Sequence, residues 1–215
     1  MHFSYGEREI EHLKQRDARL GAVIERLGRI ERTVDEDLFA AVVRHIAGQQ
    51  ISMKAQQTVW GRLVSSLGEV TPATVTQAQI PTLRAAGLSG RKVEYIRDFA
   101  QRVLDGGFDI EAVREMTDEE AIRALSALKG IGVWTAEMLL LFSLQRPDIL
   151  SFDDLGIQRG MRMVYRHRQI DRARFERYRR RLSPCGSVAS LYFWAVAGGA
   201  LPELTDPAAR KKPGG

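Results

Sequence analysis

Apolar residues recur at helical spacing along almost the whole chain. Sustained alternation of apolar and polar residues between hairpin turns, the usual mark of strands, is not found. The sequence therefore predicts an all-α protein, with helices joined by short turns. The expected helices cover residues 7–14, 20–27, 35–48, 52–67, 81–86, 91–104, 109–116, 133–145, 155–167, 172–182 and 187–197, with a further helix opening at Thr117.

One stretch, residues 125–154, breaks this pattern twice. Gly130-Ile131-Gly132 separates two apolar-periodic segments, and the acidic pair Asp153-Asp154 precedes another helix. Glycines allow positive φ and leave the amides of a following helix uncovered, which makes an anion site suited to phosphate. An ordinary helix–helix turn also often contains glycine. The pattern thus predicts a hairpin and leaves both interpretations open.

Composition narrows the class of protein. The 215 residues carry a formal charge of +5, and residues 159–181 contain ten arginines and no lysine. A solvated helix face and a surface that faces nucleic acid both explain this run. The single cysteine, Cys185, excludes an intrachain disulfide and a four-cysteine iron–sulfur cluster. The four histidines lack metal-ligand spacing. Without a membrane-length apolar run or a signal-peptide core, the expected location is cytoplasmic.

The string LKGIGVWTAEM (128–138) followed by FDDLGI (152–157) resembles the helix-hairpin-helix DNA glycosylases of the HhH-GPD superfamily. The likeness is greatest to the 3-methyladenine DNA glycosylase II branch. It extends to LFAAVVRHIAGQQIS (38–52), LRAAGLSGRK (83–92) and SVASLYFW (187–194). The resemblance implies an all-α, two-lobed fold with a DNA-binding cleft between the lobes, in a compact form that lacks an N-terminal β-domain.

This resemblance also implies a division of the chain. Residues 1–45 should form N-terminal helices that pack with the C-terminal lobe, and residues 46–150 a helical domain that ends in the helix-hairpin-helix. Residues 151–205 should form the C-terminal lobe that carries the catalytic aspartate. Residues 206–215 are expected to be a disordered tail.

The catalytic carboxylate implied by the family is Asp154, from its spacing to Trp134 and its place directly before Leu-Gly-Ile. Cleavage of an N-glycosidic bond develops oxocarbenium character on the sugar, which a nearby carboxylate stabilises. Asp153 is the alternative, and its structural role would be to cap the helix that begins near Leu155.

A flipped, electron-poor purine stacks well on tryptophan. Trp134 and Trp194 are therefore the expected pocket walls and Phe152 the floor, although core packing also explains both tryptophans. Trp60 lies in a core-like helix and is interpreted as packing. At two positions where the longer bacterial enzymes are expected to carry aromatics, this chain has Met138 and Leu155, which predicts a less aromatic pocket.

Contacts with DNA are expected at the hairpin and at two turns. Lys129 and the amides around Gly130 and Gly132 should hold backbone phosphate, with Arg91 as a further contact and Arg159 and Arg162 as weaker candidates. The gap left by the flipped base should be filled by one of four side chains, which are Gln49, Gln50, Leu88 and Ser89. For the two glutamines, hydrogen bonding within their own turn is an equal alternative.

The family often binds a monovalent cation, sodium or potassium, through hairpin carbonyls. In this chain these would be the carbonyls of Ser126, Leu128 and Ile131.

Together these features predict a monomeric, monofunctional DNA glycosylase that removes alkylated purines from double-stranded DNA in base excision repair. No cofactor is required, and no iron–sulfur cluster or membrane partner is expected. Relatives that also cut the backbone carry a lysine where this chain has Trp134, so no Schiff base is expected there. The alternatives are a glycosylase for another damaged or mispaired base, and a helix-hairpin-helix protein that binds DNA without catalysis.

Overall fold

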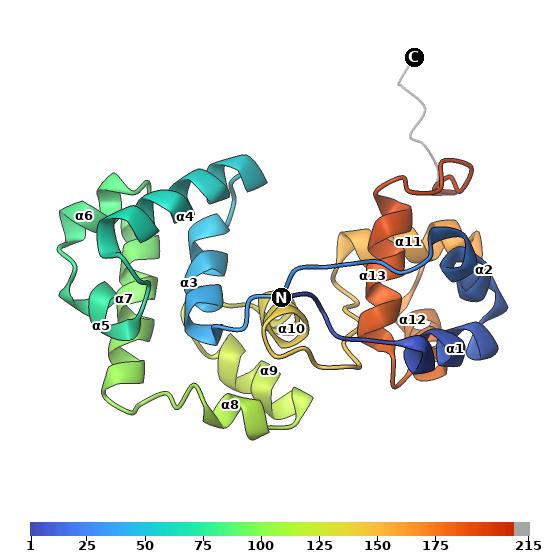
Figure 1. Ribbon diagram of the computed structural model, residues 1–215, viewed down its shortest axis with the longest axis horizontal. Coiled ribbons are helices and arrows are strands. Elements are labelled where there is room, and N and C mark those ends of the chain that lie inside the picture. Colours follow the sequence, from blue (N-terminus) through green and yellow to red (C-terminus); the bar gives the residue numbers. More distant parts are fainter. Residues whose placement is uncertain (209–215) are drawn as a thin grey trace, which may run out of the picture. The chain divides into compact units, whose positions relative to one another are not determined.

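The computed structural model describes residues 1–208, and this part of the chain forms thirteen α-helices. Its helices are drawn in Figure 1, and its β-structure is limited to one isolated bridge between His2 and Thr33. The all-α prediction is confirmed. The helix predicted to open at Thr117 begins with a reciprocal cap, in which the Glu120 amide donates to Thr117 Oγ1 and the Thr117 amide donates to Glu120 Oε2.

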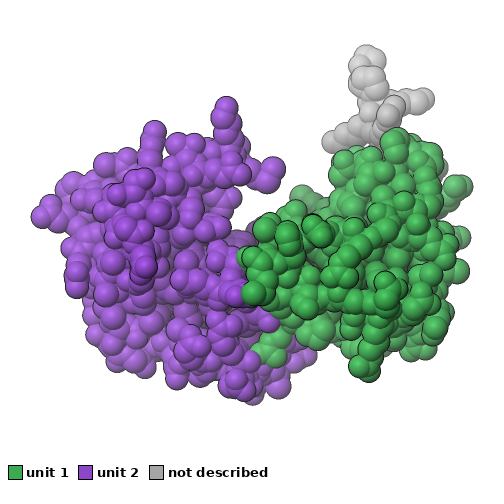
Figure 2. All heavy atoms as spheres, in the orientation of Figure 1, with its two compact units in different colours: residues 1–34, 145–215 green, residues 35–144 purple. Residues whose placement is uncertain are grey.

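The chain forms two compact units, coloured separately in Figure 2. Unit 2 is residues 35–144, and unit 1 combines residues 1–34 with the chain from Gln145 onward. The divisions therefore lie at 34/35 and 144/145 instead of the expected 45/46 and 150/151. The physical reason for the first shift is the helix Leu38–Gly48, which is buried on most sides by other helices of unit 2.

Helix α3 lies at the centre of unit 2. Its apolar residues between Leu38 and Ala47 form much of the hydrophobic core of this unit. Phe39 stacks on Phe99 of α7, with ring centroids 5.0 Å apart. The core thus joins segments distant in sequence. The helices of unit 2 are α3 (Leu38–Gly48), α4 (Met53–Leu67), α5 (Pro72–Gln77), α6 (Ile80–Ala85), α7 (Gly90–Leu104), α8 (Ala112–Glu115), α9 (Asp118–Ser126) and α10 (Val133–Phe142).

Unit 1 is centred on α13, which is apolar almost all round and contacts the other helices of the unit. Its closest neighbour is α11, because Gly160 lets the two backbones approach. A Cβ at Gly160 would lie 2.1 Å from the Phe193 carbonyl oxygen. The helices of unit 1 are α1 (Glu7–Arg16), α2 (Ala18–Leu27), α11 (Leu155–Tyr165), α12 (Arg172–Leu182) and α13 (Gly186–Ala197).

A buried carboxylate ties three of these helices together. Asp17 caps α2 by accepting from the amides of Arg19 and Leu20, and its other oxygen accepts from the Tyr165 hydroxyl and from Arg181. Desolvation, and then the charge of Asp17, hold the pKa of Tyr165 well above its usual value. Tyr165 therefore stays a neutral donor.

The chain after α13 is ordered further than the sequence predicted. Asp206 binds Arg162 through two hydrogen bonds of 2.9 and 2.5 Å, and it also accepts from the amide of Ala208. Residues 206–208 of the expected tail are thus fixed on α11, while residues 209–215 lie outside the described range. No helix in the described part of the chain is both long and apolar enough to span a membrane.

Candidate active site and nucleic-acid interface

In unit 1, Asp154 lies at the N-terminus of α11 as its capping residue. Its Oδ1 accepts from the amide of Ile157 at 2.8 Å, and the residue is 7% exposed. The capping role considered for Asp153 is therefore wrong, because the cap is Asp154, while Asp153 is exposed. A carboxylate at a helix N-terminus is stabilised by the helix dipole and by the amide it binds.

A second donor fixes the same oxygen. The indole Nε1 of Trp194, on α13, donates to Asp154 Oδ1 at 2.9 Å. Gly156 makes this contact possible, because a Cβ there would lie 2.7 Å from the Trp194 ring and 3.1 Å from Asp154 Oδ1. The structure thus brings together Asp154 and Trp194, which the sequence predicted for one site, through a bond that the sequence did not predict.

The other predicted pocket residues of unit 1 flank this carboxylate in sequence. Leu155 is 85% exposed, directly after the cap. Phe152 is partly buried and packs edge-on against Phe175, with the Arg172 guanidinium 4.7 Å above its ring. Phe152 therefore anchors α12 next to the capping turn, and Leu155 leaves an apolar surface open beside Asp154.

In unit 2, α9 and α10 form the predicted helical hairpin. Gly130 has φ +84°, and a Cβ there would lie 2.5 Å from the Tyr95 ring, so only glycine fits this turn. Gly132 precedes α10 and provides no side-chain cap. The first turn of α10 therefore presents backbone amides in the way an anion-binding helix N-terminus does.

Side chains of α10 differ in their exposure. Trp134 and Val133 are exposed by 43% and 50%, so both present an apolar surface beside the amides of the hairpin. Met138, one turn further, is 3% exposed and lies in the core of unit 2. Met138 was predicted to line the base pocket, and within unit 2 its side chain is packed among other residues.

The predicted cationic contacts are tied to acidic partners to different degrees. Lys129 lies 3.2 Å from Asp98 and 3.6 Å from Glu94, and its pKa is raised, chiefly by its hydrogen bond to Asp98. Arg162 is bound by Asp206 on unit 1, which also lies 3.9 Å from Arg159. Phosphate would compete with carboxylates at these three residues.

The Gln49-Gln50 turn is linked to the hairpin. The Gln49 side chain donates to the carbonyl of Gly130 at 2.5 Å, and the Gln49 carbonyl accepts from Lys92 Nζ at 2.7 Å. Lys92 also donates to Ala47, and burial lowers its pKa. Gln50 is exposed with φ +58°.

Ile51 and Met53 lie beside this turn and are exposed by 39% and 81%, and neither was predicted from the sequence as a site residue. In the sequence, the feature that could have identified them is a large apolar side chain next to the Gln-Gln pair.

The second predicted turn is less suited to entering DNA. Leu88 is 3% exposed, and Ser89 caps α7 by accepting from the Lys92 amide. Burial removes Leu88 from the candidates that could enter DNA, and Ser89 already holds a helix end. Arg91 is exposed in the first turn of α7.

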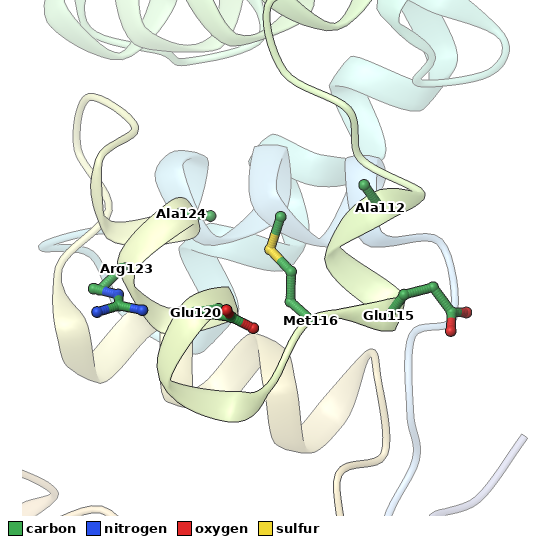
Figure 3. A pocket seen from close by; sticks show the side chains of 6 residues that line it. All are labelled: Ala112, Glu115, Met116, Glu120, Arg123 and Ala124. Carbon is green, nitrogen blue, oxygen red and sulfur yellow. The ribbon is translucent and has the colours of Figure 1, made fainter.

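A surface hollow on unit 2 contains none of these residues. It lies between α8 and α9, with Glu115 and Arg123 at opposite ends and Met116 between them (Figure 3). Glu120, also in its lining, is the cap partner of Thr117. Within residues 1–208, no cluster of histidine, cysteine or acidic side chains is arranged to hold a metal ion.

A glycine hairpin and a helix-capping aspartate followed by Leu-Gly-Ile define a class, the helix-hairpin-helix proteins of base excision DNA repair. The sequence matches the HhH-GPD superfamily of base excision DNA repair proteins over residues 43–185, and the chain belongs to this superfamily. The resemblance inferred from the sequence is confirmed.

Several similar proteins are named DNA-3-methyladenine glycosylases. The chain is 31% identical to DNA-3-methyladenine glycosylase 1 of Schizosaccharomyces pombe over 179 residues, which cover 81% of this chain and 78% of that protein. It is 28% identical to the putative DNA-3-methyladenine glycosylase YfjP of Bacillus subtilis, covering 81% of this chain and 64% of that protein.

Solved structures agree with the fold. A DNA-3-methyladenine glycosidase from Bacillus halodurans superposes with a TM-score of 0.84 at 34% identity, covering 94% of this chain and 95% of that one. The S. pombe 3-methyladenine DNA glycosylase Mag1, in complex with abasic DNA, gives 0.76 at 28% identity, covering 89% and 97%.

Proposed function

We propose that this protein is a monofunctional DNA glycosylase that hydrolyses the N-glycosidic bond of alkylated purines of the 3-methyladenine type. The observation that carries the proposal is the Asp154 carboxylate, whose Oδ1 is held by the Ile157 amide and the Trp194 indole. A protein that only binds DNA has no need for a carboxylate fixed in this way. The relatives named above carry the same activity in their names.

In the proposed reaction, Asp154 acts on the sugar of the flipped nucleotide. The bond between C1′ and the base nitrogen breaks, and its electron pair leaves with the purine, neutralising the positive charge of an alkylated base. The carboxylate stabilises the oxocarbenium-like sugar and accepts a proton from the water that attacks C1′. The products are a free base and an abasic site.

Two features of unit 2 serve the binding of DNA in this proposal. The amides at the start of α10 hold a backbone phosphate, and Trp134 offers an exposed ring to the damaged base. Gln50 fills the gap in the duplex, because it is exposed, whereas the side chain of Gln49 is engaged by Gly130.

The carbonyls of Ser126, Leu128 and Ile131 are suited to a monovalent cation, since the donors are oxygens. The Leu128 carbonyl accepts from the Ile131 amide at 3.1 Å, and a carbonyl oxygen has a second lone pair. A cation bound there would stabilise the turn between α9 and α10. No step of the proposed hydrolysis uses it.

Release of free base tests the substrate class. Duplexes containing methylated purines, uracil, hypoxanthine or 8-oxoguanine are incubated with the protein side by side, and the released bases are measured by chromatography. We expect release from methylated DNA, and strand cleavage only after hot alkali is added, because Trp134 provides no amine for a Schiff base.

Strand cleavage without alkali would contradict the monofunctional assignment. Release of another base alone would reassign the substrate. No release from any duplex, with binding retained, would favour a protein that binds DNA without catalysis.

The indole N–H of Trp194 can be tested separately from its ring. Trp194→Phe keeps an aromatic ring but removes the donor to Asp154, and a hydrogen bond to a charged group is worth about 1.5–3 kcal/mol. We expect the single-turnover excision rate to fall about tenfold or more, with the affinity for undamaged duplex unchanged. Quenched time courses of base release and fluorescence anisotropy measure the two quantities.

The matched control replaces Trp194 with benzothienylalanine, which has nearly the same shape and sulfur in place of N–H. It should lose activity in the same way as Trp194→Phe. Wild-type rates for both variants would show that Trp194 acts only as a packing or stacking ring.

A further inference from the structure

Five arginines of unit 1 surround His167 at the end of α11 opposite Asp154, and we call this group the arginine surface. They come from the start of α2, from the segment between α11 and α12, and from α12, and four of them are exposed while Arg174 is partly buried. The members of the arginine surface are Arg19, Arg166, Arg168, Arg174 and Arg177.

The charges of the arginine surface are not neutralised. Arg19 donates to the carbonyl of Tyr165 and Arg174 to the carbonyl of Gln169, at 2.6 and 2.9 Å. Carbonyls orient a guanidinium without cancelling its charge. Within residues 1–208, none of the five forms an ion pair with a carboxylate.

The electrostatic environment of His167 reflects this excess of positive charge. Its pKa is lowered, first by burial and then by the charges of Arg174, Arg19 and Arg177, and only Asp171 opposes them. The ring of His167 is bonded to the Tyr178 hydroxyl at 2.8 Å, and Tyr178 stacks on Tyr165. The arginine surface therefore rests on rigid aromatic groups.

We propose that the arginine surface binds the phosphate backbone of a second DNA segment, separate from the duplex whose base is excised. This inference rests on the proposed function, since it presupposes a protein that works on DNA.

Two observations separate this surface from Asp154. The cap Asp154 and the C-terminal Arg166 bound an eleven-residue helix, which spans roughly 16 Å at the usual rise per residue. Between them, Arg159 and Arg162 share one carboxylate, that of Asp206. This carboxylate reduces the positive charge in the middle of α11, whereas within residues 1–208 the arginine surface has no carboxylate in an ion pair with it.

The chemistry of the surface favours nucleic acid over an acidic protein. Guanidinium forks match phosphate oxygens in pairs. Protein interfaces instead centre on buried apolar or aromatic anchors. Among the described residues, the large apolar side chains that are exposed lie elsewhere, at positions such as Met53, Trp134 and Leu155.

A protein that holds two segments can pass directly from one to the other. The test is the dissociation rate of the full-length protein from a long, labelled, undamaged duplex, followed by stopped-flow fluorescence at increasing concentrations of unlabelled duplex. For the wild type, we expect this rate to rise with competitor concentration. For Arg168→Gln/Arg177→Gln, we expect it to be independent of competitor.

The salt dependence of binding to the second duplex should also change in this variant. Its logarithmic slope should flatten by about 0.9 for each phosphate that the variant no longer neutralises. Excision from a methylated duplex little longer than one helical turn should keep its wild-type rate.

The matched control is Arg8→Gln/Arg123→Gln, which removes the same charge from exposed arginines outside the arginine surface. It should retain transfer that depends on competitor. Arg168→Lys/Arg177→Lys should restore much of the transfer, because it keeps the charge, and wild-type thermal unfolding would show that the glutamine variant is folded.

Three results would overturn the proposal. Unchanged transfer in Arg168→Gln/Arg177→Gln would mean a solvated face, and a parallel loss of excision on the short duplex would mean contact with the substrate duplex itself. Polyglutamate that displaces the second duplex at equal charge concentration would point to an acidic protein partner. Because the transfer readout uses undamaged DNA, it stands or falls independently of base release.

Discussion

Replacement of Asp154 by asparagine is expected to lower the single-turnover rate of base release by about a thousandfold or more, the scale of a lost catalytic carboxylate. Asparagine is also a good helix cap, and its side-chain oxygen can accept the bonds from Ile157 and Trp194 that Asp154 accepts. The substitution therefore removes negative charge and leaves the local geometry in place. Affinity for damaged duplex, measured by anisotropy, should be retained.

Asp153→Asn is the matched control, because it removes the neighbouring exposed carboxylate, which does not cap α11. It should retain wild-type base release. If Asp153→Asn were inactive and Asp154→Asn active, the two roles would be exchanged. If both were active, no carboxylate of this turn would be catalytic.

Among the glycine-to-alanine substitutions in unit 1, Gly160→Ala should produce the largest loss of stability. The new Cβ would lie 2.1 Å from the carbonyl oxygen of Phe193 and 2.6 Å from its carbon, both backbone atoms that cannot rotate away. Overpacking commonly costs about 1–3 kcal/mol, and a clash between two backbones belongs at or above the upper end of that range. Urea unfolding followed by circular dichroism measures it.

Gly61→Ala is the corresponding control in α4 of unit 2. A Cβ at Gly61 would meet no atom within 4 Å, so the alanine should raise stability by up to about 1 kcal/mol through helix propensity. If Gly160→Ala were as stable as the wild type, α11 and α13 would have room to separate, and their close contact would not be needed for the fold.

Local patterns in the sequence predicted the helices, the hairpin and the start of a helix at Thr117, because each depends on residues within a few positions. The cap at Asp154 shows where such patterns fail. Asp153 and Asp154 are adjacent acids, and only the folded backbone determines which one accepts the Ile157 amide. The Trp194 bond to Asp154 joins residues forty positions apart, which no local pattern encodes.

Burial and ion pairing were the least predictable features of the candidate site. Leu88 and Met138 belong to turns or helices with the right motif, yet both side chains point into the core of unit 2. Arg162 belongs to an arginine-rich run that suggested a DNA-binding surface. In the structure its guanidinium is bound by the carboxylate of Asp206, far along the chain. Long-range packing decides these contacts, so periodicity and composition cannot reveal them.

The bonds around Gln49 have a consequence for how unit 2 meets DNA. Gln49 joins its own turn to Gly130, and Lys92 fastens that turn to α7, so the exposed Gln50 and the amides of the hairpin belong to one preassembled body. A preassembled surface loses little conformational entropy when it binds. The distance between Gln50 and the amides of the hairpin is then fixed before DNA binds. DNA in which the spacing between a bound phosphate and the neighbouring base stack fits this distance would be bound preferentially.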